Sequence, residues 1–298
     1  MITCNLKINT LVKQSQCSTK TYTARTFLAV MSSGYKAWLG EKERDENFFT
    51  IEPQNCKLIK LFLNQSEDLS SSYFEQLVAE VLHDLLIFGR AYMLINPKYI
   101  TITNEDGIEN KELNSLDMGA VSGVVKRQNN QVFEFCALSK FDNALHCTTV
   151  PKDQLVIFDL KDLGYRRNFF YRLINILNKF DSTSIPADLN LCRGYNFTEH
   201  YKYIKLQELK QLKTVGWVDN SNDLLDSYRL YNQIRMNKIR VGLLKYVVMK
   251  INEGLKRYLN ETDDGELVLH ARSVDYDRCW LDYSSGKISH DQLRELLY

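Results

Sequence analysis

The chain has 298 residues, of which 44% are hydrophobic and 25% charged, and its formal net charge is +1 at pH 7. These are ordinary values for a folded protein, and the length allows one large domain or two smaller ones. The balanced charge predicts neither a nucleic-acid-binding protein nor an acidic mimic, so any such role must depend on how charge is distributed along the chain.

The cysteine, histidine and hydropathy patterns bear on compartment and metal binding. Seven cysteines are dispersed without a C-x-x-C pair, and the five histidines never stand at metal-ligand spacing. We therefore expect free thiols in a reducing compartment and neither a metal nor a cofactor, although a zinc site assembled from distant residues stays open. Because there is no signal-peptide core and no apolar run near the roughly 20 residues that span a bilayer, we expect a cytoplasmic protein that does not engage a membrane.

The first 65 residues predict irregular or short elements, among them a short helix at Lys57–Leu63. The first clear helix begins at Ser72, which is spaced to form a capping box with Glu75, and we expect Gly89 to end it. Its apolar residues recur at helical spacing and predict one buried face: Phe74, Leu77, Val78, Val81, Leu82 and Leu85.

From there to about residue 160 the pattern is that of β-strands. We expect an apolar strand at Ala91–Asn96 that stops at Pro97, and then an alternating strand at Tyr99–Thr103. Two hairpins follow in the prediction. Their strands are Val121–Arg127 with Gln131–Ala137, and Leu145–Val150 with Leu155–Leu160.

The rest of the chain is mainly helical in pattern. We expect helices at Asn168–Phe180 and near Glu199–Val215, and a long helix from about Asp223 to Leu259. A strand at Glu266–Val274 and a short helix capped by Ser289 complete the tail, with Gln292 as capping-box partner. A helix, then a β-meander, then helices favour an α+β fold over alternating βαβ units.

Catalytic signatures are missing from the sequence. It contains no phosphate-binding glycine loop, no nucleophile elbow and no H-E-x-x-H pair, so we assign no catalytic residue. His83 and Asp84 are neighbours on a helix and should point about 100° apart, which predicts a polar helix edge rather than a catalytic pair. The aspartates near the C-terminus lack the loop spacing of a calcium site and predict a solvated acidic surface.

Charge is segregated in the last quarter of the chain. Residues 227–258 carry eight basic residues and one acidic residue, a net +7, whereas residues 259–298 carry a net −5. Three interpretations stay open: contact with a phosphate backbone, pairing between subunits, and neutralisation within one chain. The candidate residues for lining a DNA channel or for assembly are Arg229, Arg235, Lys238, Arg240, Lys245 and Lys250.

Two stretches in the first 160 residues follow a family pattern. In Lys57–Asn96, a leucine-rich segment and a small polar cap precede a helix that ends in Gly89-Arg-Ala-Tyr92. In Leu116–Leu160, a β-meander ends in the run from Val150 to Phe158, VPKDQLVIF.

A third stretch, Leu267–Leu297, matches the pattern at four positions and departs from it at Asp291-Gln292, where the family has Asn-Glu. The matching residues are Gly286, Ile288, Ser289 and Arg294. Together the three stretches resemble the portal proteins of tailed bacteriophages, of the long-tailed siphophage type. The chain departs from that family in lacking a G-x-S-P-L motif before the central helices and in being short, so clip and crown regions are expected to be reduced.

The resemblance implies a portal-like wing with a β-meander, packed helices and a long, stem-like central helix. It divides the chain into an irregular N-terminal segment, a helix-plus-meander region, a stem-like region, and a C-terminal strand with a capped helix. Their bounds are 1–65, 66–165, 166–260 and 261–298.

By the same resemblance, the protein would form a cyclic homo-oligomer, commonly of twelve subunits in this family, at one vertex of the capsid. It would be assembled in the host cytoplasm, reside in the virion and catalyse no reaction. Double-stranded DNA would pass through its channel during packaging and ejection, and its partners would be capsid, terminase and head–tail adaptor proteins. One alternative is an intracellular nucleic-acid-binding protein that uses the basic helix 227–258, and another is an enzyme with an unrecognised motif.

Overall fold

The computed structural model describes residues 22–34, 48–54, 56–63, 71–103, 109–121, 124–129, 131–138, 145–180, 198–199, 202, 206, 213–217, 226–259, 265–271 and 274–297. Contacts divide them into two compact units. Those of unit 1 fall in Asn47–Arg167 and Lys245–His270, and those of unit 2 in Thr19–Glu46, Asn168–Leu244 and Ala271–Tyr298. Helices combine with small antiparallel sheets, which confirms the predicted α+β class. The four sequence regions stay a prediction.

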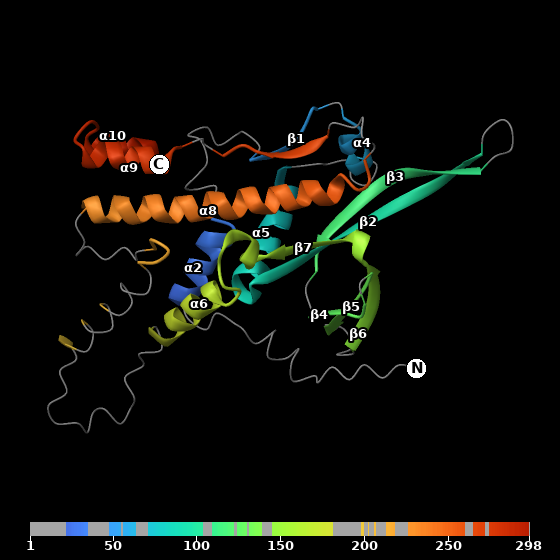
Figure 1. The fold of residues 1–298 in the computed structure, drawn as a ribbon, viewed down its shortest axis with the longest axis horizontal. Helices are drawn as coiled ribbons and strands as arrows, with labels where there is room; N and C mark the ends of the chain where they lie inside the picture. The colour runs from blue at the N-terminus through green and yellow to red at the C-terminus, as the bar shows by residue number, and fades with distance from the viewer. Residues whose placement is uncertain are drawn as a thin grey trace, which may run out of the picture. The chain divides into compact units, whose positions relative to one another are not determined.

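Unit 1 is built on a three-stranded antiparallel sheet in which β2 (Arg90–Thr103) lies between β3 (Glu109–Ala120) and β7 (Leu155–Asp159) (Figure 1). In the first half of β2 every second residue is buried, as expected for a strand with one face toward a core. Helix α5 (Ser71–Phe88) contacts β2 and β3 and supplies that core. All six residues of its predicted apolar face are buried.

Helix α5 begins one residue before the predicted Ser72 and ends, as predicted, just before Gly89. The short helix α4 (Lys57–Leu63) also forms as predicted, and the rings of Phe62 and Phe74 join the two helices edge to face, 5.6 Å apart. Gly89 ends α5 with φ of 72°, a conformation that favours glycine, and β2 starts at the next residue. The predicted capping box of α5 involves the Ser72 side chain, which lies outside the described part of the chain.

Strand β2 runs through Pro97 to Thr103, so the predicted stop at Pro97 is wrong. Proline has no amide hydrogen to donate and is tolerated where a strand has one neighbour only. Strand β7 pairs with β2 over Arg90–Leu94, and beyond this β2 pairs with β3 alone, with a register shift between Lys98 and Tyr99. Pro97 therefore lies on a single-partnered part of β2.

A second three-stranded sheet has the order β4 (Val124–Arg127), β5 (Val132–Leu138), β6 (Leu145–Pro151). The predicted hairpin of the first two strands is confirmed. The predicted pairing of the third with β7 is wrong, because the 3-10 turn η1 (Lys152–Gln154) redirects the chain and β7 joins β2 instead. The physical reason is burial: four of the five β7 residues are buried, whereas Cys147 to Thr149 of β6 are exposed.

A two-stranded sheet of β1 (Phe49–Glu52) and β8 (Glu266–Leu269) completes unit 1. The last part of helix α8 (Asp226–Leu255), from Lys245 onward, belongs to the same unit. The Asn252 side chain of α8 donates to the Leu267 backbone carbonyl at 2.9 Å and accepts from the Leu267 backbone amide at 2.8 Å, as a neighbouring strand would. The strand predicted at Glu266–Val274 is thus present in shorter form, while β1 was not predicted.

Unit 2 contains α2 (Tyr22–Ser32), α6 (Phe169–Phe180), the part of α8 up to Leu244, α9 (Tyr276–Ser284) and α10 (His290–Leu297). Helices α2 and α6 contact each other, and the rings of Tyr231 and Trp280 join α8 to α9 at 4.7 Å. The capping box of α10 is confirmed: Ser289 Oγ accepts from the Gln292 amide at 3.2 Å, and the Gln292 side chain accepts from the Ser289 amide at 2.8 Å. The helix predicted near Glu199–Val215 lies largely outside the described residues.

Candidate functional site

The two family-like stretches of the first 160 residues meet in one sheet. Arg90 stands opposite Asp159 and Tyr92 opposite Ile157 in the β2–β7 pair. The Arg90 guanidinium donates to Asp159 Oδ2 from two nitrogens, at 3.2 and 2.7 Å. A paired strand register and a two-point ion pair therefore connect segments nearly 70 residues apart in the sequence.

Asp159 is the centre of a larger polar cluster in unit 1. Arg167 donates to the same carboxylate from Nε at 3.0 Å and from Nη2 at 2.5 Å, and the Lys161 amide donates to Oδ1 at 3.1 Å. The Asp159 side chain is only 12% exposed. Burial alone would raise its pKa, but the hydrogen bonds from Arg167 and Arg90 outweigh this and hold the pKa of the carboxyl well below its usual range.

Helix α8 joins this cluster through Tyr246. Its hydroxyl accepts from the Asp159 amide at 2.8 Å and donates to the Asp162 carboxylate at 2.7 Å, at the start of the 3-10 turn η2 (Leu160–Leu163). Burial and the neighbouring carboxylates raise the pKa of Tyr246, so the phenol remains a donor at neutral pH. The cluster therefore fixes the end of β7, the start of β2 and one turn of α8 together.

Gly89 makes this arrangement sterically possible. The Gly89 carbonyl accepts from the Leu160 amide at 3.1 Å. A Cβ atom at Gly89 would collide with the carbonyl group of Arg167. Only glycine therefore combines the left-handed turn at the end of α5 with the close approach of the Arg167 backbone. The sequence pointed to Gly89 as a helix end, but not to this contact.

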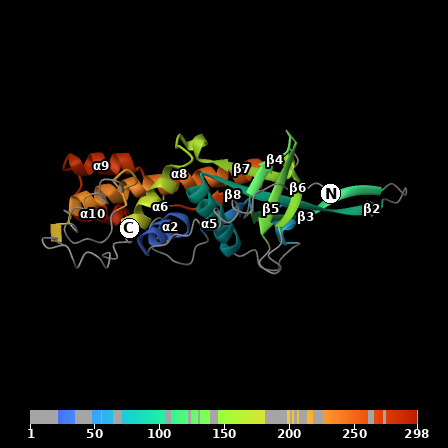
Figure 2. The same ribbon diagram turned by 90° about the horizontal axis from the view of Figure 1, so that it is seen from below.

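The outer half of the β2–β3 pair forms a two-stranded arm, which we define as Lys98–Thr103 with Glu109–Leu113. Figures 1 and 2 show these strands running out beyond β4, β5, β6 and β7. The arm is exposed along Lys98–Thr103, including the large apolar side chains of Tyr99, Ile100 and Ile102, which are 55%, 43% and 38% exposed. Isolated two-stranded ribbons are marginally stable in water, so an arm that exposes three large apolar side chains among polar ones gains from a partner.

The six candidate cations of α8 do not form one face. Apart from Asp226 in its first turn, the exposed residues of α8 follow a single stripe at spacings of three and four: Lys238, Gly242, Lys245, Met249 and Glu253. Lys238 and Lys245 lie on this stripe, while Arg229, Arg235 and Lys250 are partly buried and lie off it. Arg240 is 1% exposed and does not reach the surface.

Burial lowers the pKa of Arg240 to about 9, and its guanidinium reaches the Asn237 side chain at 3.5 Å. Arg240 is therefore part of the interior of unit 2, and the structure removes it from the solvent-facing candidates. The sequence treated α8 as a basic surface helix, but apolar residues around most of its circumference make it central to the core of each unit. These residues include Ile234, Leu243, Leu244, Val247 and Ile251.

Several of the other cations are paired within the chain. Lys238 Nζ lies 2.6 Å from Asp277 of the acidic C-terminal segment, and Lys250 lies 2.8 Å from Glu253. Arg235 donates to the Thr214 carbonyl at 3.3 Å and covers the ring of Tyr231. Neutralisation within one chain, the third of the three interpretations, therefore applies to Lys238.

The other acidic and histidine candidates have structural surroundings. Asp275 caps α9 by accepting from the Arg278 amide at 3.1 Å, and Asp282 lies 3.1 Å from Lys287. His83 Nδ1 lies 3.3 Å from Asp84 Oδ1, so the expectation that these neighbours point apart is wrong. The pair stands on an exposed helix edge, since the His83 side chain is 48% exposed.

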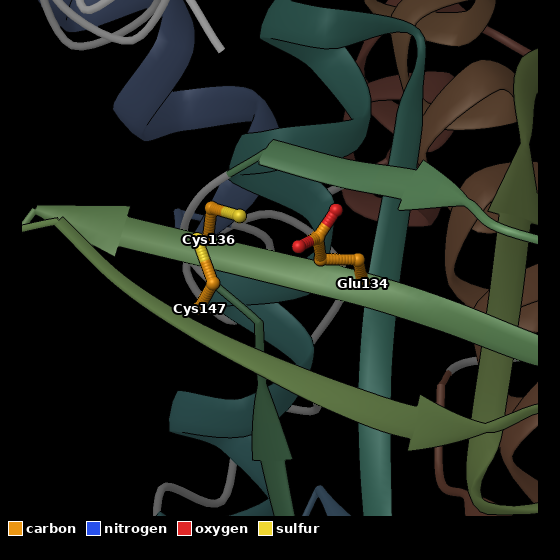
Figure 3. A group of neighbouring side chains, drawn as sticks. All are labelled: Glu134, Cys136 and Cys147. Atoms are coloured by element: carbon orange, nitrogen blue, oxygen red, sulfur yellow. The ribbon is translucent and has the colours of Figure 1, made fainter. Parts of the chain in front are cut away.

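Two further features of unit 1 could hold a ligand. A pocket of about 350 Å³ lies between the two three-stranded sheets and is lined mainly by apolar side chains such as Leu94, Phe133 and Leu155. On the opposite face of β5, Glu134 and Cys136 lie beside Cys147 of β6 and could bind a metal ion (Figure 3). The sequence missed this group because it paired β6 with the wrong strand.

Comparison of the chain with protein-family models gave no match, and comparison with curated proteins gave none either. In the described part of the chain, every helix is too short or too polar to span a lipid bilayer.

Proposed function

We propose that this chain is a portal-like structural protein, of the kind found in tailed bacteriophages. It assembles into a closed ring at one capsid vertex, gives double-stranded DNA a channel for packaging and ejection, and offers a docking platform to capsid, terminase and head–tail adaptor proteins. It acts by assembly and not by catalysis.

The junction of β2 and β7 carries this proposal. Arg90–Tyr92 of the first family-like stretch pairs with Ile157–Asp159 of the second, and the Arg90 guanidinium binds the Asp159 carboxylate there. Two sequence patterns that meet in one structural junction are stronger support than either alone. The long helix α8, fixed to the same junction by Tyr246, agrees with a stem-like helix that supports a wing-like region.

The arm provides a surface for ring closure. A cyclic ring requires a heterologous interface, in which one surface of each subunit meets a different surface of its neighbour. The exposed apolar residues Ile100 and Ile102, which share one face of β2, satisfy the first half of this requirement because they project from the sheet that holds the junction. The exposed stripe of α8 has a mixed character, with Lys238 already paired, which suits loose contact with passing DNA rather than tight binding.

The rival proposal, a nucleic-acid-binding protein that uses the basic helix, has less support. Arg240 is buried and Lys238 is neutralised by Asp277, so the net +7 of residues 227–258 overstates the charge that α8 presents to solvent. The other basic residues of α8 are spread around the helix and do not form a row on one face that could follow a groove of the DNA.

Light scattering coupled to gel filtration tests the proposal on the purified full-length chain. We expect a mass many times 34.8 kDa. Replacing Ile100 by Asp places a charge at the apolar arm surface and should shift the protein toward monomer. The matched variant Thr101→Asp changes the neighbouring exposed residue, on the opposite face of the strand, and should keep the oligomer. A monomer at every protein concentration for the unaltered chain would overturn the proposal.

A further inference from the structure

We propose that Glu134, Cys136 and Cys147 form a Zn²⁺ site that joins β5 to β6. Cys136 and Cys147 are directly opposite each other in the antiparallel register of these strands. Glu134 precedes Cys136 by two residues, so the two side chains lie on the same face of β5. Figure 3 shows all three side chains gathered over these two strands.

The distances suit one metal ion. One ligand atom from each of the three residues lies within 4.8 Å of the other two. In a tetrahedral zinc site with Zn–S near 2.3 Å and Zn–O near 2.1 Å, ligand atoms are separated by roughly 3.5–3.8 Å. Small side-chain rotations therefore close the site without moving either strand.

The donor types select the metal. Two thiolates with one carboxylate form a set that binds Zn²⁺ well and Mg²⁺ or Ca²⁺ poorly. Three protein ligands leave a fourth position of the tetrahedron open. Cys136 is buried, Glu134 is partly buried and Cys147 is exposed, so this fourth position is reached from the Cys147 side and can be filled by water.

A neighbouring residue already orients the carboxylate. The Gln128 side chain donates a hydrogen bond to Glu134 Oε2. A carboxylate has two oxygens, so Oε1 can face the metal while Oε2 keeps this bond, as outer-shell partners of metal ligands commonly do. Gln128 is thus a positioning residue for the site.

Binding releases protons, because zinc is held by thiolates and not by thiols. For each Zn²⁺ bound, Cys136 and Cys147 each lose the proton on sulfur to solvent, about two protons in total near neutral pH. The bound ion connects two strands across their register, so it should also slow hydrogen exchange of the β5 and β6 amides.

The test uses the full-length chain, kept reduced and freed of metal. Added Zn²⁺ should bind with one-to-one stoichiometry, and added Co²⁺ should give the visible absorption bands of a tetrahedral thiolate complex. Cys147→Ser should abolish the Co²⁺ bands, and Cys279→Ser, which removes a thiol from α9 instead, should leave them unchanged. Gln128→Ala should weaken Zn²⁺ binding by about 10–100-fold, and it should leave the fold intact because Gln128 is exposed.

Since Cys136 is buried, its Ser variant alone would not separate loss of the site from loss of the fold. Hydrogen exchange of β5 and β6, with and without Zn²⁺, supplies the second measurement for Cys147→Ser. Protection that increases with Zn²⁺ in the unaltered chain but not in Cys147→Ser supports the site. The proposal is overturned if the reduced chain binds no more Zn²⁺ than Cys147→Ser, or if Cys136 and Cys147 form a disulfide that resists reduction.

Discussion

Replacing Asp159 by Asn removes the charge from the junction of β2, β7 and α8 while keeping the shape of the side chain. Asn retains an oxygen that can accept from the Lys161 amide, so the local turn is preserved and the loss isolates the two arginine interactions. Asp159 accepts three close bonds from Arg167 and two from Arg90.

The size of the stability loss expected for Asp159→Asn depends on how far Asp159 and its two arginine partners are buried. Breaking a buried ion pair from one side costs about 3–5 kcal/mol. The Asp159 side chain is buried, but those of Arg90 and Arg167 are 37% and 42% exposed, so both guanidinium groups can regain water. Solvent screening therefore reduces the expected loss in the free energy of unfolding to below that range, about 2–3 kcal/mol at pH 7.

The pH dependence gives this prediction a distinct signature. The pKa of Asp159 is lower in the folded chain than in the unfolded chain, where it is about 3.9. A lowered folded-state pKa means that the carboxylate stabilises the fold above about pH 4 and that this contribution is lost as the pH falls further. The difference between the unaltered chain and Asp159→Asn should thus be constant from pH 7 to about pH 5 and shrink below about pH 4.

Urea unfolding monitored by tryptophan fluorescence and circular dichroism measures both the stability loss at pH 7 and its dependence on pH. Asp117→Asn, an exposed carboxylate of β3, is the matched control and should change the free energy of unfolding by less than about 0.5 kcal/mol. A loss below about 1 kcal/mol for Asp159→Asn, or a difference that does not vary between pH 7 and pH 3, would refute the assignment of Asp159 as the charged centre of the junction.

Four further predictions follow from the same geometry. Leu85→Ala, at a fully buried position of α5, should cost about 2–5 kcal/mol, and Phe88→Ala, at a 42% exposed position, should cost clearly less in the same urea assay. Gly89→Ala should destabilise the chain far more than Gly164→Ala in thermal unfolding: both glycines have positive φ, at about 1–2 kcal/mol for any other residue, but only Gly89 meets backbone atoms. Because Lys238 is already paired within the chain, the oligomer mass in light scattering should change little between 0.1 M and 1 M salt, where the Debye length falls from about 10 to about 3 Å; dissociation would instead indicate a charged seam between subunits. Competition binding to duplex DNA at physiological salt should be weak and uniform, whereas preference for one sequence by about 10³-fold or more would favour a regulator.

Periodic and capping signals in the sequence were sufficient for most helices. The apolar spacing of α5, the glycine after it and the reciprocal Ser289–Gln292 cap are local features, and each appears in the structure as predicted. Strand partners are not local. We predicted that β6 pairs with β7 because a proline-containing turn separates them. In the structure β7 pairs with β2 instead, where most of its side chains are buried.

The candidate sites also divide into features set by local sequence, which could be predicted, and features set by distant segments, which could not. Charge counting identified the cations of α8 but could not tell that Arg240 faces inward, because that depends on what surrounds the helix. The Asp159 cluster depends on a strand pair between distant segments, and the Glu134, Cys136 and Cys147 group depends on the β5–β6 register, so neither was visible as a motif. An aspartate ending an apolar strand and an arginine after a helix-ending glycine were the available signals for the first.

Electron microscopy of the purified full-length chain tests the central claim most directly. The portal proposal predicts closed rings of uniform size with a central channel, seen end-on in negatively stained class averages, and fewer rings for Ile100→Asp than for Thr101→Asp. Particles that are uniformly monomeric or dimeric, or open filaments without closure, would contradict it.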